Sequence, residues 1–158
     1  MVKVVSVLQP WASLIVTGNK KLETRSWNTK YRGTLYIHAS MKKPNIDKMD
    51  DNFTNQYLKL MLLGDGIQVP HFDQLPLGAI IGKVDLIETI KSDKDTINRK
   101  QDFHYGSLFE YTPQELAFGD YSTNRFGWLL ANPVMFDKPI PAKGQLGIWN
   151  FDYKLIIS

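Results

Sequence analysis

The sequence predicts an α+β fold in which a small, mostly antiparallel β-barrel carries a few flanking helices. Segments of strong β propensity outnumber segments with helical spacing, and the two kinds do not alternate strictly along the chain. The chain has 158 residues, of which 43% are hydrophobic, so it is long enough for one domain with a substantial core and short for two. Because no Gly/Ser-rich linker divides it, we expect a single domain over residues 1–158.

Strands and one short helix are expected in the first forty residues. The segment KVVSVLQ predicts a first strand. Pro10 suits the start of a helix over residues 10–17, and Gly18 suits its left-handed end. The segments KLETRSW and TLYIHAS predict the second and third strands.

Residues 45–63 have a helical pattern. Apolar side chains recur there at helical spacing, with Asp and Lys between them: Ile46, Met49, Phe53, Tyr57, Leu60 and Met61. The pattern predicts an amphipathic helix whose apolar stripe packs on a sheet, and a groove for a partner is the second interpretation.

The second half of the chain returns to strands. The segment AIIGKVDLIETI predicts a long strand in which Gly82 marks a bulge or a close backbone approach. In YTPQELA, Thr112 is expected to cap a helix, with Pro113 at its first position and Glu115 three residues after the cap. The segments FGWLLAN, QLGIWNF and YKLII predict closing strands.

Composition narrows the possible functions. A formal charge of +3 permits a polyanionic partner without requiring one. The absence of cysteine excludes disulfides, thiolate catalysis and cysteine-based zinc sites. No apolar run approaches the length of a membrane span, and MVKVVSVLQP lacks the apolar core of a signal peptide. We therefore expect a cytoplasmic protein with no membrane partner; the sequence specifies no oligomeric state.

Sequence motifs for metal or cofactor chemistry are missing. His38, His71 and His104 are scattered without the spacing of metal ligands. The sequence has no Gly-rich phosphate loop, serine-nucleophile elbow or histidine–aspartate triad. We expect no metal and no cofactor.

Two dense charged clusters are candidate sites. In KKLETRSW, strand alternation places Lys21, Glu23 and Arg25 on one face, where the cations favour an ionised Glu23. A lysine desolvated beside a carboxylate can act as nucleophile or proton carrier, and the alternative is a surface ion-pair ladder of small energetic value. In FGDYSTNRFGW, Asp120 and Arg125 either complete a site or pair to hold their loop.

Two tryptophans bracket the first cluster. Trp11 and Trp27 offer stacking surfaces, and Arg25 and Arg32 offer guanidinium groups that can grip phosphate. This combination suits single-stranded RNA or a nucleobase ligand. Tryptophan is also a common core residue, so packing in the core is the alternative for each.

The segment QPWASLIVTG followed by NKKLETRSW resembles the ASCH family, whose members have a PUA-like β-barrel. That family carries a Gln-Pro-Trp-Ala helix start and a Gly-x-Lys-x-x-Glu-x-Arg signature, which falls here on Gly18, Lys20, Glu23 and Arg25. The resemblance continues through YRGTLYIHAS, GAIIGKVDL, FGDYSTNRFGWLL and KGQLGIW. The signature selects Lys20 over Lys21, which is consistent with strand alternation if Lys20 lies in the turn before the strand and Lys21 faces solvent.

The resemblance spans nearly the whole chain. Residues 45–63 and 91–108 fall outside it. It therefore implies one PUA-like domain with variable insertions at about these two places.

The resemblance implies a cleft beside the signature that binds RNA or a modified nucleoside. Gln9, Trp11, Arg25, Asp120 and Arg125 are the expected binding residues. In this interpretation the arginines meet phosphate or carbonyl groups, and Trp11 forms an aromatic wall.

Hydrolysis is the alternative that the resemblance implies. Some small members are amidohydrolases that remove acyl groups from acylated cytidine, and others are ribonucleases, which makes Lys20 and Glu23 the candidate catalytic residues. The amidohydrolases carry threonine where this chain has Glu23. They also use a later glutamate, and no motif here assigns that acid to Glu115 or to Asp120, which lie in roughly the right region. Enzymatic activity is left open, and a protein-interaction adaptor that uses the inserted helix is the second alternative.

Overall fold

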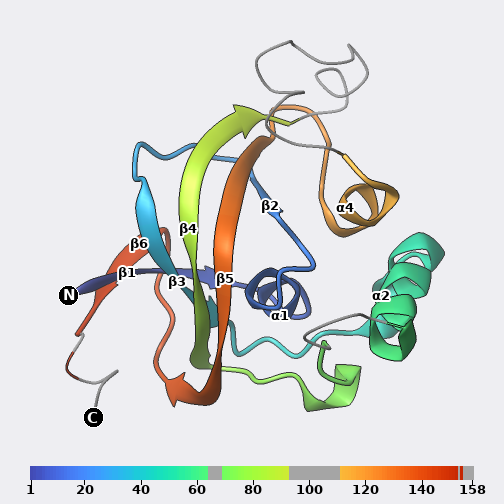
Figure 1. Ribbon diagram of the computed structural model, residues 1–158, viewed down its shortest axis with the longest axis horizontal. Coiled ribbons are helices and arrows are strands. Elements are labelled where there is room, and N and C mark those ends of the chain that lie inside the picture. The colour runs from blue at the N-terminus through green and yellow to red at the C-terminus, as the bar shows by residue number, and fades with distance from the viewer. Residues whose placement is uncertain (64–68, 93–110, 153, 155–158) are drawn as a thin grey trace.

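The computed structural model describes residues 1–63, 69–92, 111–152 and 154. Its strands form one curled sheet in the order β2-β5-β4-β3-β1-β6, a half-barrel (Figure 1). They are β1 (Val2–Val7), β2 (Leu22–Arg25), β3 (Gly33–Ala39), β4 (Ala79–Lys91), β5 (Phe126–Pro141) and β6 (Ile148–Phe151). β1 and β3 are parallel, and the other described neighbours are antiparallel. The predicted α+β fold with a mostly antiparallel, barrel-like sheet is confirmed.

Helices cover one side of this sheet. They are α1 (Trp11–Val16), α2 (Asp51–Leu63), α4 (Pro113–Phe118) and two short 3₁₀ helices, η1 (Ile46–Lys48) and η2 (Phe72–Gln74). α1 packs inside the curl, where Ile15 and Val16 join Leu35, Trp128 and other buried residues in the main core. Figure 1 shows α2 and α4 beside α1, on the side of the molecule opposite β6.

The start of α1 is fixed by a side chain. Gln9 accepts a hydrogen bond from the backbone N–H of Ser13 at 3.0 Å, and its amide group donates to the Ser13 hydroxyl and to the Pro76 carbonyl, both at 2.9 Å. Pro10 is the residue before the first helical turn, one position earlier than predicted for it. Gly18 ends the helix with φ of +79°, the left-handed conformation that the sequence predicts there.

The prediction for residues 45–63 was partly wrong. The segment divides into η1 and α2 instead of forming one helix. The apolar stripe of α2 does not use a sheet as its main support; Phe53 and Tyr57 pack with Leu14 of α1, Phe72 of η2 and Phe118 of α4. A second core therefore forms between helices, because α1 and α4 already stand between α2 and the strands.

Gly82 is a point of close approach, as predicted. A Cβ atom there would lie 2.2 Å from the carbonyl oxygen of Val134 and 2.7 Å from the Val16 side chain. The β4–β5 register shifts between Ile80 and Gly82. Glycine therefore lets β5 and α1 approach the same point of β4.

The C-terminal strands differ in length from the predictions. β5 continues to Pro141, well past the segment FGWLLAN, because it pairs with β4 along most of its length. β6 confirms the strand expected in QLGIWNF. The strand predicted in YKLII lies outside the described residues except for Lys154, as does most of the insertion expected at 91–108.

Candidate functional site

A cleft of about 570 Å³ opens where the sheet meets the outer helices. Its walls are the end of β1, strand β2, α1 at Trp11, the residues around the start of α2, and α4 with the loop that follows it. Glu23, Thr24 and Arg25 bring the predicted charged cluster into this cleft, and Asp120 and Arg125 reach it from the other predicted cluster. The fold thus joins two clusters that lie about a hundred residues apart.

Arg25 connects the edge strand β2 to β1. Its Nη2 atom donates to the carbonyl oxygen of Ser6 at 2.8 Å and lies 3.3 Å from the Glu23 carboxylate. Its guanidinium carbon lies 5.8 Å from the ring centroid of Trp128. The Nε–H of Arg25 is buried and has no hydrogen-bond partner within the described part of the chain. The Ser6 carbonyl and the Glu23 carboxylate therefore hold the guanidinium in place.

Arg125 is held in a parallel way. Its Nη2 atom donates to the carbonyl oxygen of Thr24 at 3.0 Å and lies 3.8 Å from the Asp120 carboxylate. Its Nε–H is also buried without a partner among the residues described. Asp120 is fixed in turn, because its backbone N–H donates to the Thr24 hydroxyl at 3.0 Å. Asp120 and Arg125 thus pair within their loop, and both line the cleft; their part in a binding site stays a prediction.

Charges in the cleft are balanced. The described lining has three cationic side chains and three carboxylates: Arg25, Lys48, Arg125, Glu23, Asp50 and Asp120. The described lining is therefore neutral overall, so an anion would bind there through contacts with individual arginines and not through general attraction. The cleft suits a ligand that offers acceptors to the arginines and hydrogen-bond donors to the carboxylates.

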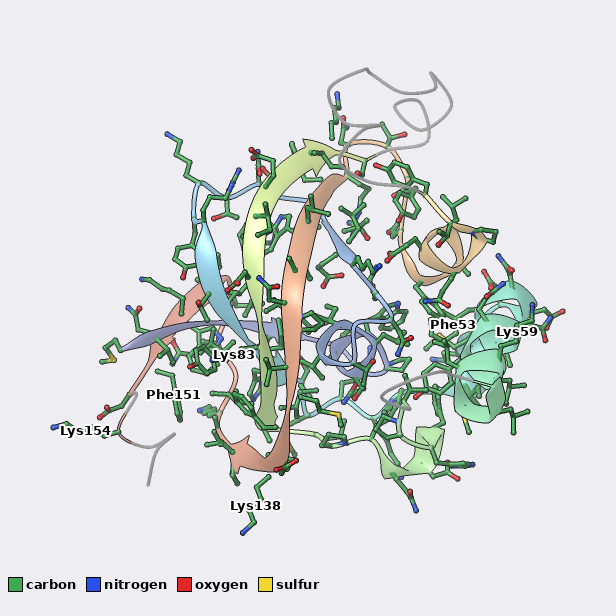
Figure 2. The ribbon with its side chains drawn as sticks, viewed as in Figure 1. Phe53, Lys59, Lys83, Lys138, Phe151 and Lys154 are labelled. Atoms are coloured by element: carbon green, nitrogen blue, oxygen red, sulfur yellow. The ribbon has the colours of Figure 1, made fainter. Side chains whose placement is uncertain are left out.

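One wall of the cleft is aromatic. The rings of Trp11 and Phe53 lie 5.6 Å apart between centroids, at an angle of 58°. The indole Nε1–H of Trp11 donates to the Phe118 carbonyl at 2.9 Å, which fixes the ring against α4. Figure 2 shows Phe53 reaching from α2 toward the rest of the molecule. Both ring systems line the same cleft as Arg25 and Arg125.

Lys20 lies behind the cleft in the interior. Its side chain is 1% exposed, and its Nζ donates to the Leu22 carbonyl at 2.5 Å. Lys20 lies before the first residue of β2, and Lys21 is exposed. Both positions agree with the prediction that Lys20 lies in the turn before the strand and Lys21 faces solvent. Burial lowers the pKa of Lys20, and the charges of Glu23 and Glu115 oppose that shift. Of these three described residues, Glu23 alone lines the cleft.

Three other residues singled out in the sequence lie elsewhere. Gln9 is outside the cleft lining of the described chain, because its amide is used by α1. Trp27 packs edge-on against Trp128 with ring centroids 4.8 Å apart. Arg32 forms a surface ion pair with Glu88 at 2.6 Å. The sequence suggested a stacking surface from Trp11 or Trp27 and a phosphate contact from Arg25 or Arg32. Trp11 and Arg25 line the cleft together.

The sequence matches the model of the ASCH domain over residues 5–140. The chain belongs to the ASCH domain family. This match includes the two cleft-forming clusters, strands β2, β3 and β4, and β5 up to residue 140.

Two curated relatives are similar to this ASCH domain over 150 residues. They are Activating signal cointegrator 1 of Homo sapiens, at 35% identity, and Activating signal cointegrator 1 of Mus musculus, at 33% identity. Each alignment covers 95% of this chain and 22% of the relative. The chain thus spans about a fifth of the length of these relatives.

Solved structures support the same fold. The crystal structure of the ASCH protein of Zymomonas mobilis superimposes with a TM-score of 0.52 at 14% identity, covering 98% of this chain and 90% of that one. A tyrosine-to-phenylalanine mutant of the same bacterial protein gives a TM-score of 0.53 at 15% identity, covering 98% of this chain and 93% of that one. At these identities the similarity concerns the fold.

Sequence reasoning missed several residues of the cleft. Ser6 and Ser40 line it from the ends of β1 and β3, and Phe53 lines it from α2. Ser6 is the one polar residue in VVSVL, which was a usable sign. Phe53 gave no such sign, because its helical spacing indicates a core residue as well as it indicates a cleft wall.

Neither a metal centre nor a membrane-spanning helix is found in the described part of the chain. The residues described include no group of three or more His, Cys, Asp or Glu side chains placed to hold a metal ion. Within the same residues, no helix has both the length and the apolar character needed to cross a membrane.

Proposed function

We propose that this ASCH domain binds single-stranded RNA, or the nucleoside unit of such a strand, in the cleft beside Arg25 and Arg125. The observation that carries the proposal is that the guanidinium groups of Arg25 and Arg125 line the same cleft as the aromatic side chains of Trp11 and Phe53. Stacking of a base on an aromatic ring and pairing of its phosphate with arginine are the two contacts typical of single-strand recognition.

The size and polarity of the cleft support the same proposal. Its volume of about 570 Å³ falls within the range of roughly 300–1,000 Å³ usual for small-ligand sites. The carboxylates of Glu23 and Asp120 can accept from the N–H groups of a base, while the arginines donate to carbonyl or phosphate oxygens. A nucleotide offers both kinds of group.

Arg125→Gln is the direct test. Loss of one charge-assisted contact to phosphate is expected to weaken binding of a single-stranded RNA oligonucleotide by about 10-fold or more. Fluorescence anisotropy of labelled RNA would measure the change. Arg32→Gln is the matched control, because it removes the same charge from an ion pair outside the cleft. Equal affinity of both variants, or no binding by the unaltered protein, would contradict the proposal.

A second candidate is hydrolysis of an acylated cytidine or a related substrate. The observation in its favour is the buried charged group of Lys20, Glu23 and Glu115, in which burial lowers the pKa of Lys20 and raises that of Glu115. Glu23 reaches the cleft and would take a proton from the attacking water, then pass it to the cytidine nitrogen as the amide C–N bond breaks. The acyl group leaves as the carboxylic acid, and Glu23 returns to its starting state. Lys20 lies behind Glu23 and would act on it through its charge.

Incubation with acylated cytidine, followed by chromatography, tests this candidate. Deacylation by the unaltered protein that is lost in Glu23→Gln and in Lys20→Gln would support hydrolysis. Absence of product from the unaltered protein excludes this reaction whether or not the buried Lys20 variant folds. A ribonuclease would be tested with the same variants on an RNA substrate.

A further inference from the structure

A second pocket, of about 410 Å³, adjoins the cleft. Ser6 and Ser40 line both spaces, so these two residues form the wall between them. The rest of the second pocket comes from His38, Met41 and the loop of residues 143–146 that precedes β6. The two spaces therefore meet at Ser6 and Ser40. We call the second space the adjoining pocket.

Hydrogen bonding at the wall gives Ser6 a defined polarity. The Nε2 atom of His38 lies 2.7 Å from the Ala142 carbonyl oxygen, and its Nδ1 atom lies 3.1 Å from Ser6 Oγ. Because a carbonyl oxygen can only accept, Nε2 must carry a proton, and in the tautomer with a single ring proton Nδ1 is an acceptor. The Ser6 hydroxyl therefore donates to His38, and its oxygen lone pairs stay available to accept a hydrogen bond from a ligand.

Gly144 lets the loop reach this wall. A Cβ atom at Gly144 would lie 2.8 Å from His38 Cε1 and 3.0 Å from Ser6 Oγ. The close approach brings exposed Lys143 to the same pocket. Leu146, which is 98% exposed, and Met41, which is 72% exposed, stand on its rim. Two uncovered apolar side chains, a cation and a hydrogen-bond acceptor thus surround one space.

We propose that the adjoining pocket is a second nucleotide subsite of the same RNA-binding surface. The base of the neighbouring nucleotide lies between Met41 and Leu146 and donates an N–H group to Ser6 Oγ, while Lys143 meets the phosphate that links the two nucleotides. This inference rests on the proposed function of the cleft. The inference adds to that function, because two neighbouring subsites would bind a strand more tightly than a free nucleoside.

Titration calorimetry with cytidine monophosphate and with the dinucleotide pCpC tests the proposal. The measured quantity is the ratio of the two dissociation constants. We expect pCpC to bind about 5- to 100-fold more tightly, the gain typical of one additional stacked base. Lys143→Ala and Leu146→Ala are expected to bring this ratio close to one. Both positions are exposed, so neither substitution removes a core contact.

Lys138→Ala is the matched control. Lys138 is an exposed lysine on β5 outside both linings, and Figure 2 shows it pointing away from the sheet at the tip of the molecule. Its removal should preserve the ratio, which separates a subsite from general attraction of a basic surface.

The outcomes distinguish the two proposals. Equal affinity for both probes, with Arg125-dependent binding of each, would overturn the second subsite and leave the function of the cleft standing. An equal effect of Lys143→Ala and Lys138→Ala would overturn it as well. Failure of both probes and of longer RNA to bind would overturn both proposals.

Discussion

Glu115 places a carboxyl group in the interior, behind the cleft. Its Oε1 atom accepts from the backbone N–H of Lys21 at 2.5 Å, whereas its Oε2 atom is buried without a partner in the described residues. Burial raises the pKa of Glu115, although the Lys20 charge and the backbone N–H groups of Lys21 and Leu22 oppose the shift. The ionised carboxylate is therefore less favourable in the folded protein than in the unfolded chain.

Glu115→Gln is expected to change how stability depends on pH. Because the folded-state pKa is raised, the folded protein binds more protons than the unfolded chain between the ordinary carboxyl pKa and the raised value, so its stability falls as pH increases through that window. The glutamine variant keeps an oxygen that accepts from the Lys21 N–H, and because glutamine does not ionise, its stability does not decrease with pH for this reason. Urea unfolding from about pH 4 to about pH 8 should show the variant gaining stability relative to the unaltered protein as pH rises.

Glu88→Gln provides the comparison of opposite sign. Its hydrogen bond to Arg32 lowers the pKa of this exposed carboxyl group. The stability it contributes is present above its unfolded-state pKa and is lost as pH falls through the lowered value. If Glu115→Gln and Glu88→Gln gave the same dependence of stability on pH, burial of Glu115 would not be the cause of the change seen in Glu115→Gln.

At the scale of elements, helix α4 has a side-chain cap at its first turn and lines the cleft with its last residues. The Thr112 hydroxyl accepts from the backbone N–H of Glu115 at 3.2 Å, and Pro113 follows the cap. The cap was predicted from sequence, but the capping box is not reciprocal, because the Glu115 side chain bonds to Lys21 instead. The last residues of α4 line the cleft and hold Trp11 through the Phe118 carbonyl.

Thr112→Ala should therefore affect both stability and binding. Loss of the cap is expected to cost about 1 kcal/mol of unfolding free energy, and loosening of α4 should weaken RNA binding through Trp11. Denaturant unfolding and fluorescence anisotropy would measure the two effects. Thr112→Ser keeps the hydroxyl oxygen and should remain close to the unaltered protein. Full stability of Thr112→Ala would show that α4 is held by packing alone.

The elements were predicted to different degrees. The first three strands, α1 and α4 follow from local propensity, caps and glycines, which act over a few residues. The length of β5 did not follow, because residues past Asn132 become strand by pairing with β4. The packing of α2 did not follow either, because periodicity shows that a helix has an apolar face without showing what covers it.

At the scale of the whole molecule, the charge balance limits how RNA can bind. The formal charge is +3, and the cleft matches three cations with three carboxylates in its described lining. If Arg25 and Arg125 neutralise about two phosphate charges of a single strand, the plot of log K against log salt should have a slope of about −1 to −2. Anisotropy titrations at several salt concentrations would measure it. A slope near zero would argue against phosphate contact, and a slope beyond about −4 would indicate binding by a wider basic surface.

The sequence by itself determined the family, the order of most elements and the two charged clusters. These rest on short motifs, whose spacing is visible along the chain. Only the tertiary structure decided which charged groups meet. Glu23 and Arg25 on β2 line the cleft. Lys20, a few residues earlier, is buried and lies outside the cleft lining of the described chain. Alternation assigns side chains to faces of a strand, but the curl of the sheet and the helices around it decide what each face meets. For the same reason the sequence did not indicate that Ser6 and Phe53 line the cleft, because that depends on where the fold places β1 and α2.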